Sequence, residues 1–186
     1  MKKLLGAVLA SAVTIGAWVF GAVPAQAAPA SAPVGPAALA ADVTVKNAYN
    51  GRCLQAMGAF SGAITRLVDC AATNTAQEWD VAWVYTEAGG YYELRNAASG
   101  LCLDADWGSI GGNGTRTQVW DCVAAQTNQH WRMKPITNRP DTYQVTVETN
   151  GRCLDGAMET ISTNQGKTQL WNCLGSNQVN QHWQIT

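Results

Sequence analysis

Apolar and polar residues alternate over short stretches of this chain, and turn-forming residues separate these stretches. Residues 81–85 and 91–95 are rich in valine and tyrosine and flank a glycine-containing segment, which predicts a β-hairpin. Tyr143–Glu148 also alternates, as a half-buried strand does. No stretch has the period of a convincing amphipathic helix. The pattern therefore predicts an all-β structure.

The N-terminal part of the chain has a different pattern. A positively charged start and a nearly uninterrupted apolar stretch as far as Val23 precede the small residues of Ala25-Gln26-Ala27. This arrangement predicts a secretory signal peptide over residues 1–27. An uncleaved anchor is the alternative, since about 20 apolar residues can span a bilayer, but the Ala-x-Ala sequence favours cleavage. We expect an Ala/Pro-rich linker over residues 28–42 and one folded domain over residues 43–186.

The expected domain contains three similar units. Each unit begins with a cysteine followed by leucine, contains a second cysteine 17 or 20 residues later, and ends in Gln-x-Trp. We place the repeats at about residues 43–85, 91–135 and 143–186. Since one unit cannot bury its apolar face alone, three units around an axis predict a closed β structure.

The cysteines predict disulfides, because their number is even and the chain is expected to be exported. Six cysteines allow 15 pairings in principle, and the repeat favours one bridge within each unit. Each bridge would contribute roughly 3 kcal/mol. The close cysteine spacing of zinc sites is absent, so we expect no metal. The expected pairs are Cys53–Cys70, Cys102–Cys122 and Cys153–Cys173.

The charge balance argues against nucleic acid and anionic membranes as partners. Of 12 basic and 13 acidic residues, cleavage would remove Lys2 and Lys3 and leave 10 against 13. The basic residues are scattered rather than clustered. Asn, Gln, Thr, Gly and Trp are common, which favours a neutral, hydroxyl-rich ligand. We expect no cofactor and no membrane insertion after cleavage, and nothing in the sequence indicates an oligomeric state.

Three sequence features together resemble the ricin B-chain-type lectin domain. They are the threefold Gln-x-Trp, the Cys-Leu-Asp of residues 102–104 and 153–155, and the Gln-Leu-Trp-x-Cys of residues 169–173. The resemblance covers about residues 43–186 and implies a β-trefoil, in which three four-stranded units surround a pseudo-threefold axis. It implies that the final tryptophan of each unit packs in the core. It also implies a secreted, non-enzymatic protein that binds galactose- or xylose-type glycans.

The resemblance implies sugar-binding sites in the second and third repeats. Aspartate and asparagine would bond sugar hydroxyls, tryptophan would stack on the C–H face, and the glutamines would hold the others in place. The spacing is the same in both repeats, with 14 residues from Asp to Gln and 16 from Asp to Trp. An aspartate that caps a turn and a core tryptophan are the structural alternatives. The residues are Asp104, Gln118, Trp120, Asn128 and Gln129 in the second repeat, and Asp155, Gln169, Trp171, Asn180 and Gln181 in the third.

The first repeat departs from this pattern. Gln55, Arg66 and Val68 stand at the positions of the Asp, Gln and Trp. The Asn position falls on Ala76, and only Gln77 is kept. We expect this repeat to retain the fold and to bind little or no sugar.

Three further aromatic residues have open interpretations. Trp107 stands where the third repeat has Met158, and it either extends the second site or is an exposed loop residue. His130 and His182 occupy the middle of Gln-x-Trp. Since strand alternation points them away from the core, we expect surface or rim positions.

Two other classes of function remain as alternatives. A glycoside hydrolase needs two carboxyls about 5–9.5 Å apart, but Asp104 and Asp155 belong to different repeats, and Asp106 has no counterpart in the third. A Gly-x-Ser-x-Gly motif is also absent. A β-trefoil that binds proteins or inhibits proteases would not need the same four residue types at matched spacing twice.

Overall fold

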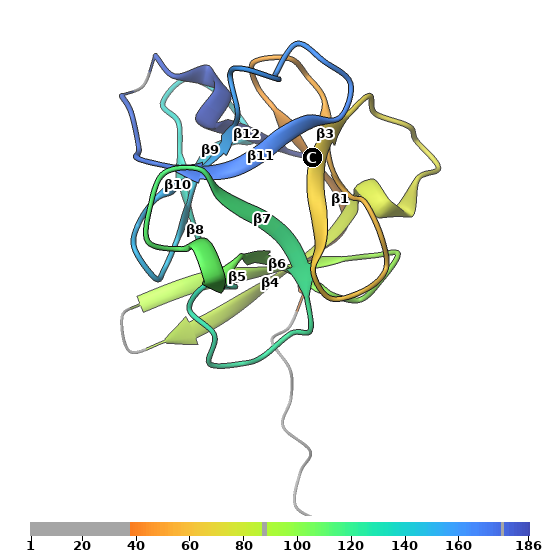
Figure 1. Ribbon diagram of the computed structural model, residues 1–186, viewed down its shortest axis with the longest axis vertical. Coiled ribbons are helices and arrows are strands. Elements are labelled where there is room, and N and C mark those ends of the chain that lie inside the picture. Colours follow the sequence, from red (N-terminus) through yellow and green to blue (C-terminus); the bar gives the residue numbers. More distant parts are fainter. Residues whose placement is uncertain (1–37, 87–88, 176) are drawn as a thin grey trace, which may run out of the picture. The chain divides into compact units, whose positions relative to one another are not determined.

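The computed structural model describes residues 38–86, 89–175 and 177–186. These residues form twelve strands of one sheet and three short 3-10 turns (Figure 1). None of the helical segments in these ranges is long and apolar enough to cross a membrane. The expected signal peptide and most of the expected linker lie outside the described residues. The elements are β1 (Ala38–Asn47), β2 (Cys53–Ala56), β3 (Ala63–Val68), η1 (Thr75–Gln77), β4 (Glu78–Thr86), β5 (Gly89–Asn96), β6 (Cys102–Ala105), η2 (Trp107–Ser109), β7 (Thr115–Trp120), β8 (Trp131–Pro135), β9 (Thr142–Val147), β10 (Cys153–Gly156), β11 (Gly166–Trp171), η3 (Val179–Gln181) and β12 (His182–Ile185).

Two of the strand predictions are confirmed, and one boundary needs correction. β4 and β5 form the expected hairpin, and β9 is the alternating strand. β1 begins at Ala38, within the segment that we expected to be linker, and pairs there with β4 through Ala38↔Ala82. Backbone ladder bonds require no particular side chain, so the alanine-rich composition concealed the start of this strand.

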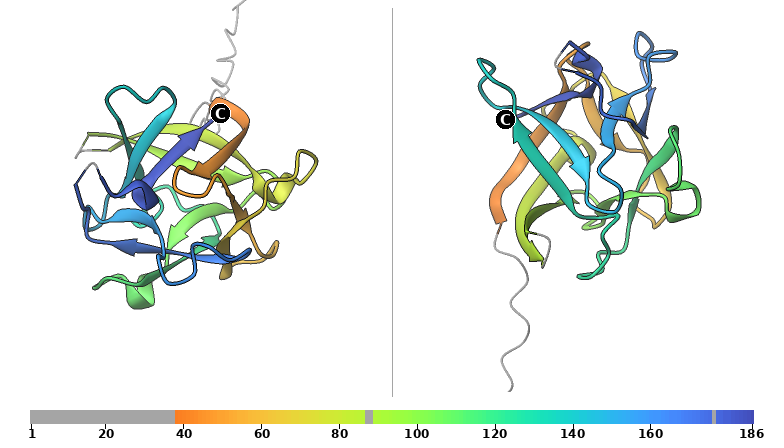
Figure 2. Two further views of the ribbon diagram at one scale, coloured as in Figure 1. Left: turned by 90° about the horizontal axis from the view of Figure 1, so that it is seen from above. Right: turned by 90° about the vertical axis from the view of Figure 1, so that its left-hand side faces the viewer.

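Six strands close into a ring of antiparallel pairs. β1 pairs with β4, and the ring continues through β5, β8, β9 and β12 back to β1. The other six form hairpins β2–β3, β6–β7 and β10–β11. β3, β7 and β11 also pair with one another and form the triangle that faces the viewer in Figure 1. Figure 1 also shows successive thirds of the domain, coloured orange to yellow, green and blue, around this triangle, and Figure 2 shows the same strands from two other sides.

The tryptophan of each Gln-x-Trp motif lies in the shared core. Trp79, Trp131 and Trp183 are all 0% exposed. The indole N–H of each donates a hydrogen bond of 2.9–3.0 Å to the carbonyl of the leucine after the first cysteine of its repeat. Burial of a tryptophan removes about 150–250 Å² from water, and the polar N–H is satisfied, so these side chains dominate the packing.

The glutamine of each motif holds the loop that follows the second cysteine of its repeat. Its Oε1 accepts from a backbone N–H of that loop at 2.8–2.9 Å. Its Nε2 donates to the carbonyl of the residue just before that cysteine at 2.9–3.0 Å. In the second repeat these partners are Val123 and Asp121. The Gln-x-Trp motif is therefore a structural element in all three repeats.

The three disulfides join the pairs that the repeat favours. Cys53–Cys70, Cys102–Cys122 and Cys153–Cys173 have Cα–Cα distances of 5.0–5.1 Å. Each bridge ties the first residue of a hairpin to the loop that follows its second strand.

Candidate functional site

The candidate site of the second repeat is built around one carboxylate. Asp104 lies on β6 directly opposite Gln118 on β7, and this register brings their side chains to the same face. The Nε2 of Gln118 donates to Asp104 Oδ1 at 3.0 Å. Arg116 in turn donates to Gln118 Oε1 at 3.1 Å, which fixes the orientation of the amide.

Two more amides reach the same carboxylate from the segment before β8. Asn128 Nδ2 donates to Asp104 Oδ2 at 2.8 Å, and Gln129 Nε2 donates to the same oxygen at 3.0 Å. A carboxylate offers about four acceptor positions. Three neutral amides fill three of them, so about one acceptor position remains for a ligand hydroxyl.

Burial controls the ionisation of Asp104. Its side chain is 3% exposed, and this burial raises the pKa of the carboxyl above its usual 3.8. Hydrogen bonds from the three amides oppose the rise, and the nearby charge of Asp106 adds to it. The Asp106 carboxylate itself is paired with Arg116 at 3.2 Å.

A hollow of about 610 Å³ opens above Asp104, with two tryptophans among its walls. Trp120 at the end of β7 is 43% exposed, and Trp107 in η2 is 61% exposed. A Cβ at Gly62, in the loop of the first repeat, would stand 3.4 Å from the Trp120 ring, so this loop supports the ring. Asn128 also lines the hollow, and its Oδ1 is buried without a hydrogen-bond partner among the described residues. The hollow thus combines an apolar platform with fixed acceptors.

The third repeat reproduces this arrangement closely. Asp155 accepts from Gln169 at 3.0 Å, Asn180 at 2.8 Å and Gln181 at 3.0 Å. Asp155 is 3% exposed, and burial raises the pKa of its carboxyl as well, with a further contribution from Glu159. Trp171 is 36% exposed at the position of Trp120. Four of the expected residues therefore gather in each repeat, and Trp120 and Trp171 end the strands that carry Gln118 and Gln169.

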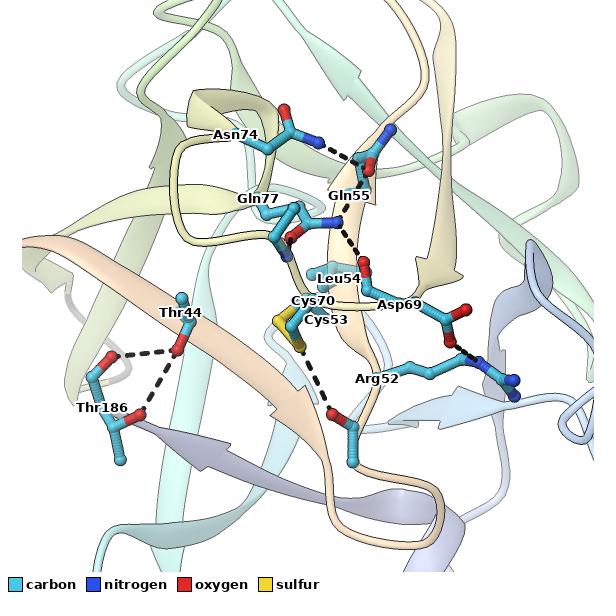
Figure 3. The surroundings of a disulfide bond; sticks show 12 residues. Thr44, Arg52, Cys53, Leu54, Gln55, Asp69, Cys70, Asn74, Gln77 and Thr186 are labelled. Carbon is cyan, nitrogen blue, oxygen red and sulfur yellow. Dashed lines mark hydrogen bonds and ion pairs between the residues drawn. A yellow bond between two sulfur atoms is a disulfide. The ribbon is translucent and has the colours of Figure 1, made fainter.

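The first repeat keeps the framework of the cluster without the carboxylate (Figure 3). The Gln55 Oε1 accepts from Gln77 at 2.9 Å and from Asn74 at 3.0 Å. We placed the missing asparagine at Ala76, but Asn74, two residues earlier, supplies the amide because it is the N-cap of η1. Val68 is partly buried where the other repeats have an exposed tryptophan.

Each repeat also accepts a backbone hydrogen bond from a neighbouring repeat through a loop side chain, which the sequence did not indicate. The backbone N–H of the residue after Trp120 donates to Ser61 at 3.0 Å. The corresponding N–H groups in the third and first repeats donate to Asn113 at 2.7 Å and Asn164 at 3.0 Å. Only the matched turn positions of these residues in the three loops could have indicated this role.

The two histidines are buried, so our expectation of surface or rim positions was wrong. His130 is 2% exposed and His182 is 0% exposed. They point away from the core tryptophans, as alternation requires, but other side chains cover that face. The Nδ1 of His130 lies 2.7 Å from Glu148 Oε2, and the Tyr91 ring stacks on the imidazole.

Neither cluster has the composition of a metal centre. Among the residues that the structure describes, no three side chains of His, Cys, Asp or Glu are placed to hold a metal ion. The clusters instead offer neutral amides, one carboxylate and one indole ring, which can bind hydroxyl groups and an apolar face.

Comparison with known proteins decides the family. Residues 34–120 and 75–171 match the model of the family described as "Ricin-type beta-trefoil lectin domain-like". The chain belongs to this family. No curated protein matches the chain in sequence at a significant level.

Solved structures share the fold of this ricin-type domain. The designed threefold-symmetric protein ThreeFoil superposes with a TM-score of 0.67 at 19% identity, over 77% of this chain and 96% of that one. A ricin B-like lectin from Macrolepiota procera, solved in complex with lactose, gives 0.62 at 18%, over 77% and 92%. The exo-β-1,3-galactanase 1,3Gal43A from Clostridium thermocellum gives 0.67 at 20%, over 78% of this chain but only 30% of that one.

Proposed function

We propose that this ricin-type protein is a secreted lectin or carbohydrate-binding module that recognises galactose- or xylose-type glycans through its second and third repeats. The observation that carries the proposal is the pair of equivalent clusters. In each, one buried aspartate is held by three amides beside a half-exposed tryptophan.

The chemistry of each cluster suits a sugar ring. Ionised Asp104 accepts a charge-assisted hydrogen bond from a ring hydroxyl, and the amide of Asn128 bonds the neighbouring hydroxyl. Trp120 packs against the apolar C–H face on the same side of the sugar. Asp155, Asn180 and Trp171 take the same roles in the third repeat. The lactose bound by the Macrolepiota procera lectin contains galactose, which supports galactose-type ligands as the first class to test.

Each site should bind weakly, and the two sites together more strongly. One indole and a few hydrogen bonds suggest about 4–5 kcal/mol per site, which is sub-millimolar to millimolar. The clusters belong to different repeats around the central triangle. Two branches of a glycan, or two chains, would therefore be needed to fill both, and avidity would raise the apparent affinity by about 10²–10⁴.

The proposal includes the processing of the chain. A signal peptide over residues 1–27 would direct export. The three disulfides of the domain are consistent with an oxidising, extracellular environment.

A glycan and polysaccharide binding panel tests this function. The mature protein is compared with an Asp104→Ala, Asp155→Ala double variant and with Gln55→Ala, the matched change in the first repeat. All three are first shown to be folded by their unfolding transitions. We expect the protein and Gln55→Ala to bind one class of neutral glycan and the double variant to lose it. Equal binding by the double variant would refute the sites. Binding to proteins with no binding to any glycan would favour an interaction or protease-inhibitor module instead.

A further inference from the structure

The second repeat carries an exposed tryptophan that the third repeat lacks. Trp107 follows Asp104 by three residues, lines the hollow above it and is 61% exposed. Met158 stands at the same position in the third repeat. An indole left in water forgoes the free energy that its burial would provide. Two exposed indoles, Trp107 and Trp120, in the walls of one hollow therefore call for a ligand that covers both.

The turn that carries Trp107 is held in place by the side chain before it. One oxygen of Asp106 accepts from a backbone N–H of η2 at 3.1 Å and caps this turn. The other oxygen accepts from the Ser109 hydroxyl at 3.1 Å and pairs with Arg116 at 3.2 Å. Ala157 replaces Asp106 in the third repeat and can make none of these contacts. The backbone beneath Trp107 is therefore fixed before a ligand arrives, which lowers the entropic cost of binding.

The strand register places the two exposed indoles at opposite ends of Asp104. Trp120 lies two residues beyond Gln118 on β7, opposite Cys102, and alternation puts its side chain on the same face as that of Gln118. At about 3.3 Å per residue, Trp120 stands about 7 Å along the hairpin from the pair Asp104↔Gln118. Trp107 lies beyond the other end of β6. A sugar ring that packs on Trp120 and bonds Asp104 therefore leaves Trp107 uncovered.

The hollow has room for more than one sugar ring. Its volume of about 610 Å³ lies within the range of about 300–1,000 Å³ that is typical of pockets for drug-sized ligands, which are larger than a monosaccharide. Gln126, an exposed residue of the loop before β8, also lines the hollow. Its amide can donate to and accept from hydroxyl groups. The hollow thus offers a second apolar platform and further polar groups beside the Asp104 cluster.

We propose that the second repeat binds at least two consecutive units of a linear glycan, whereas the third repeat binds one unit. The first unit packs on Trp120 and bonds Asp104, and the next unit of the chain packs on Trp107. Met158 is flexible and has no flat face, so a second unit adds little at the third repeat. This inference rests on the proposed function and extends it from the kind of sugar to the length of chain that each site recognises.

Calorimetric titration of single-site variants tests the proposal. Asp155→Ala leaves the second-repeat site alone, and Asp104→Ala leaves the third-repeat site alone. Each variant is titrated with galactose and lactose and with xylose and xylobiose, and the ratio of disaccharide to monosaccharide affinity is compared. We expect a ratio of about three- to tenfold at the second repeat, the size of one added aromatic contact, and a ratio close to one at the third. Equal ratios at the two sites overturn the proposal.

Two substitutions of exposed tryptophans test the assignment to Trp107. In the Asp155→Ala protein, Trp107→Met introduces the residue of the third repeat and should lower the affinity ratio to that of the third repeat. Trp83→Met is the matched control, because Trp83 is 42% exposed on β4 and does not line the hollow. It should leave the ratio unchanged. An unchanged ratio in Trp107→Met, or an equal fall in Trp83→Met, contradicts the assignment.

A further measurement needs no substitution. In the mature protein, the indole N–H resonance of Trp107 should shift saturably with a disaccharide and much less with its monosaccharide, and equal shifts overturn the proposal. The outcomes also separate this inference from the proposed function. If the Asp155→Ala protein binds none of the four sugars, the proposed second-repeat site fails and this inference fails with it. If it binds a monosaccharide and gains nothing from a second unit, this inference alone fails.

Discussion

Replacing Thr117 with valine would open a closed ring of three buried hydroxyl groups. Thr65, Thr117 and Thr168 lie on β3, β7 and β11 at the centre of the triangle, and all three are at most 4% exposed. Every pair of their hydroxyl oxygens is 2.7 Å apart. Three hydroxyls can satisfy one another completely, because each donates once and accepts once around the ring.

The loss in free energy of unfolding depends on how many hydroxyl groups each substitution leaves unpaired. Thr117→Val removes two of the ring contacts. The Thr168 hydroxyl can still donate to the backbone carbonyl of Thr65 at 2.9 Å, so the remaining pair is left with an unmet acceptor position in a buried site, which costs about 1–3 kcal/mol. Thr65→Val and Thr168→Val should cost similar amounts. Independent costs would add to about 3–9 kcal/mol in the triple variant. The triple variant has no unpaired hydroxyl, however. We therefore expect its free energy of unfolding to fall by no more than about the amount that one single substitution costs.

Denaturant unfolding of the disulfide-bonded protein measures these free energies. Thr44→Val is a matched control, because Thr44 and Thr186 also form a hydroxyl pair, at 3.3 Å, but in an exposed position (Figure 3). The control should change stability by less than about 0.5 kcal/mol. A triple variant whose loss equals the sum of the three single losses would refute the idea of a coupled ring.

Four other outcomes follow from the structure. Burial raises the pKa of Asp104 and Asp155 above 3.8, so glycan binding measured against pH should be lost as the pH falls through these raised values. The same shift favours the folded state most below about pH 3.8, and this contribution to stability is lost as the pH rises through the folded-state pKa. Trp120→Ala should weaken glycan binding at the second repeat about two- to tenfold in calorimetry and leave the unfolding midpoint nearly unchanged, since the ring is 43% exposed. Replacing Cys102 and Cys122 together with alanine opens a loop of 20 residues and should lower the free energy of unfolding by about 3 kcal/mol in urea titrations.

The repeats allowed much of the fold to be predicted before the structure. A motif that recurs at one spacing must occupy equivalent positions, which favoured one cysteine pair within each repeat, and the resemblance to the ricin-type family implied that the tryptophans lie in the core. The same reasoning placed Asp104 and Asp155 in matched surroundings, although it could not supply the distances to their amide partners. The threonine ring also recurs at matched positions, but a sequence does not indicate that three equivalent side chains meet on an axis.

Other features depended on contacts that no repeat encodes. Alternation turned His130 and His182 away from the core, but both are buried, and His130 is covered by Glu148 and Tyr91, which lie far from it in the sequence. Asn74 contacts Gln55 from the N-cap position of the 3-10 turn η1, whereas the alignment of the repeats placed the equivalent residue at Ala76.

The most direct test of sugar binding by two of the three repeats is residue-specific. Once the panel has named a sugar, the indole N–H resonances of the mature protein are followed by NMR during a titration with it. We predict saturable shifts at Trp120 and Trp171, with the buried Trp79, Trp131 and Trp183 nearly unchanged. A sugar that binds without shifting Trp120 or Trp171 would contradict the assignment of the sites.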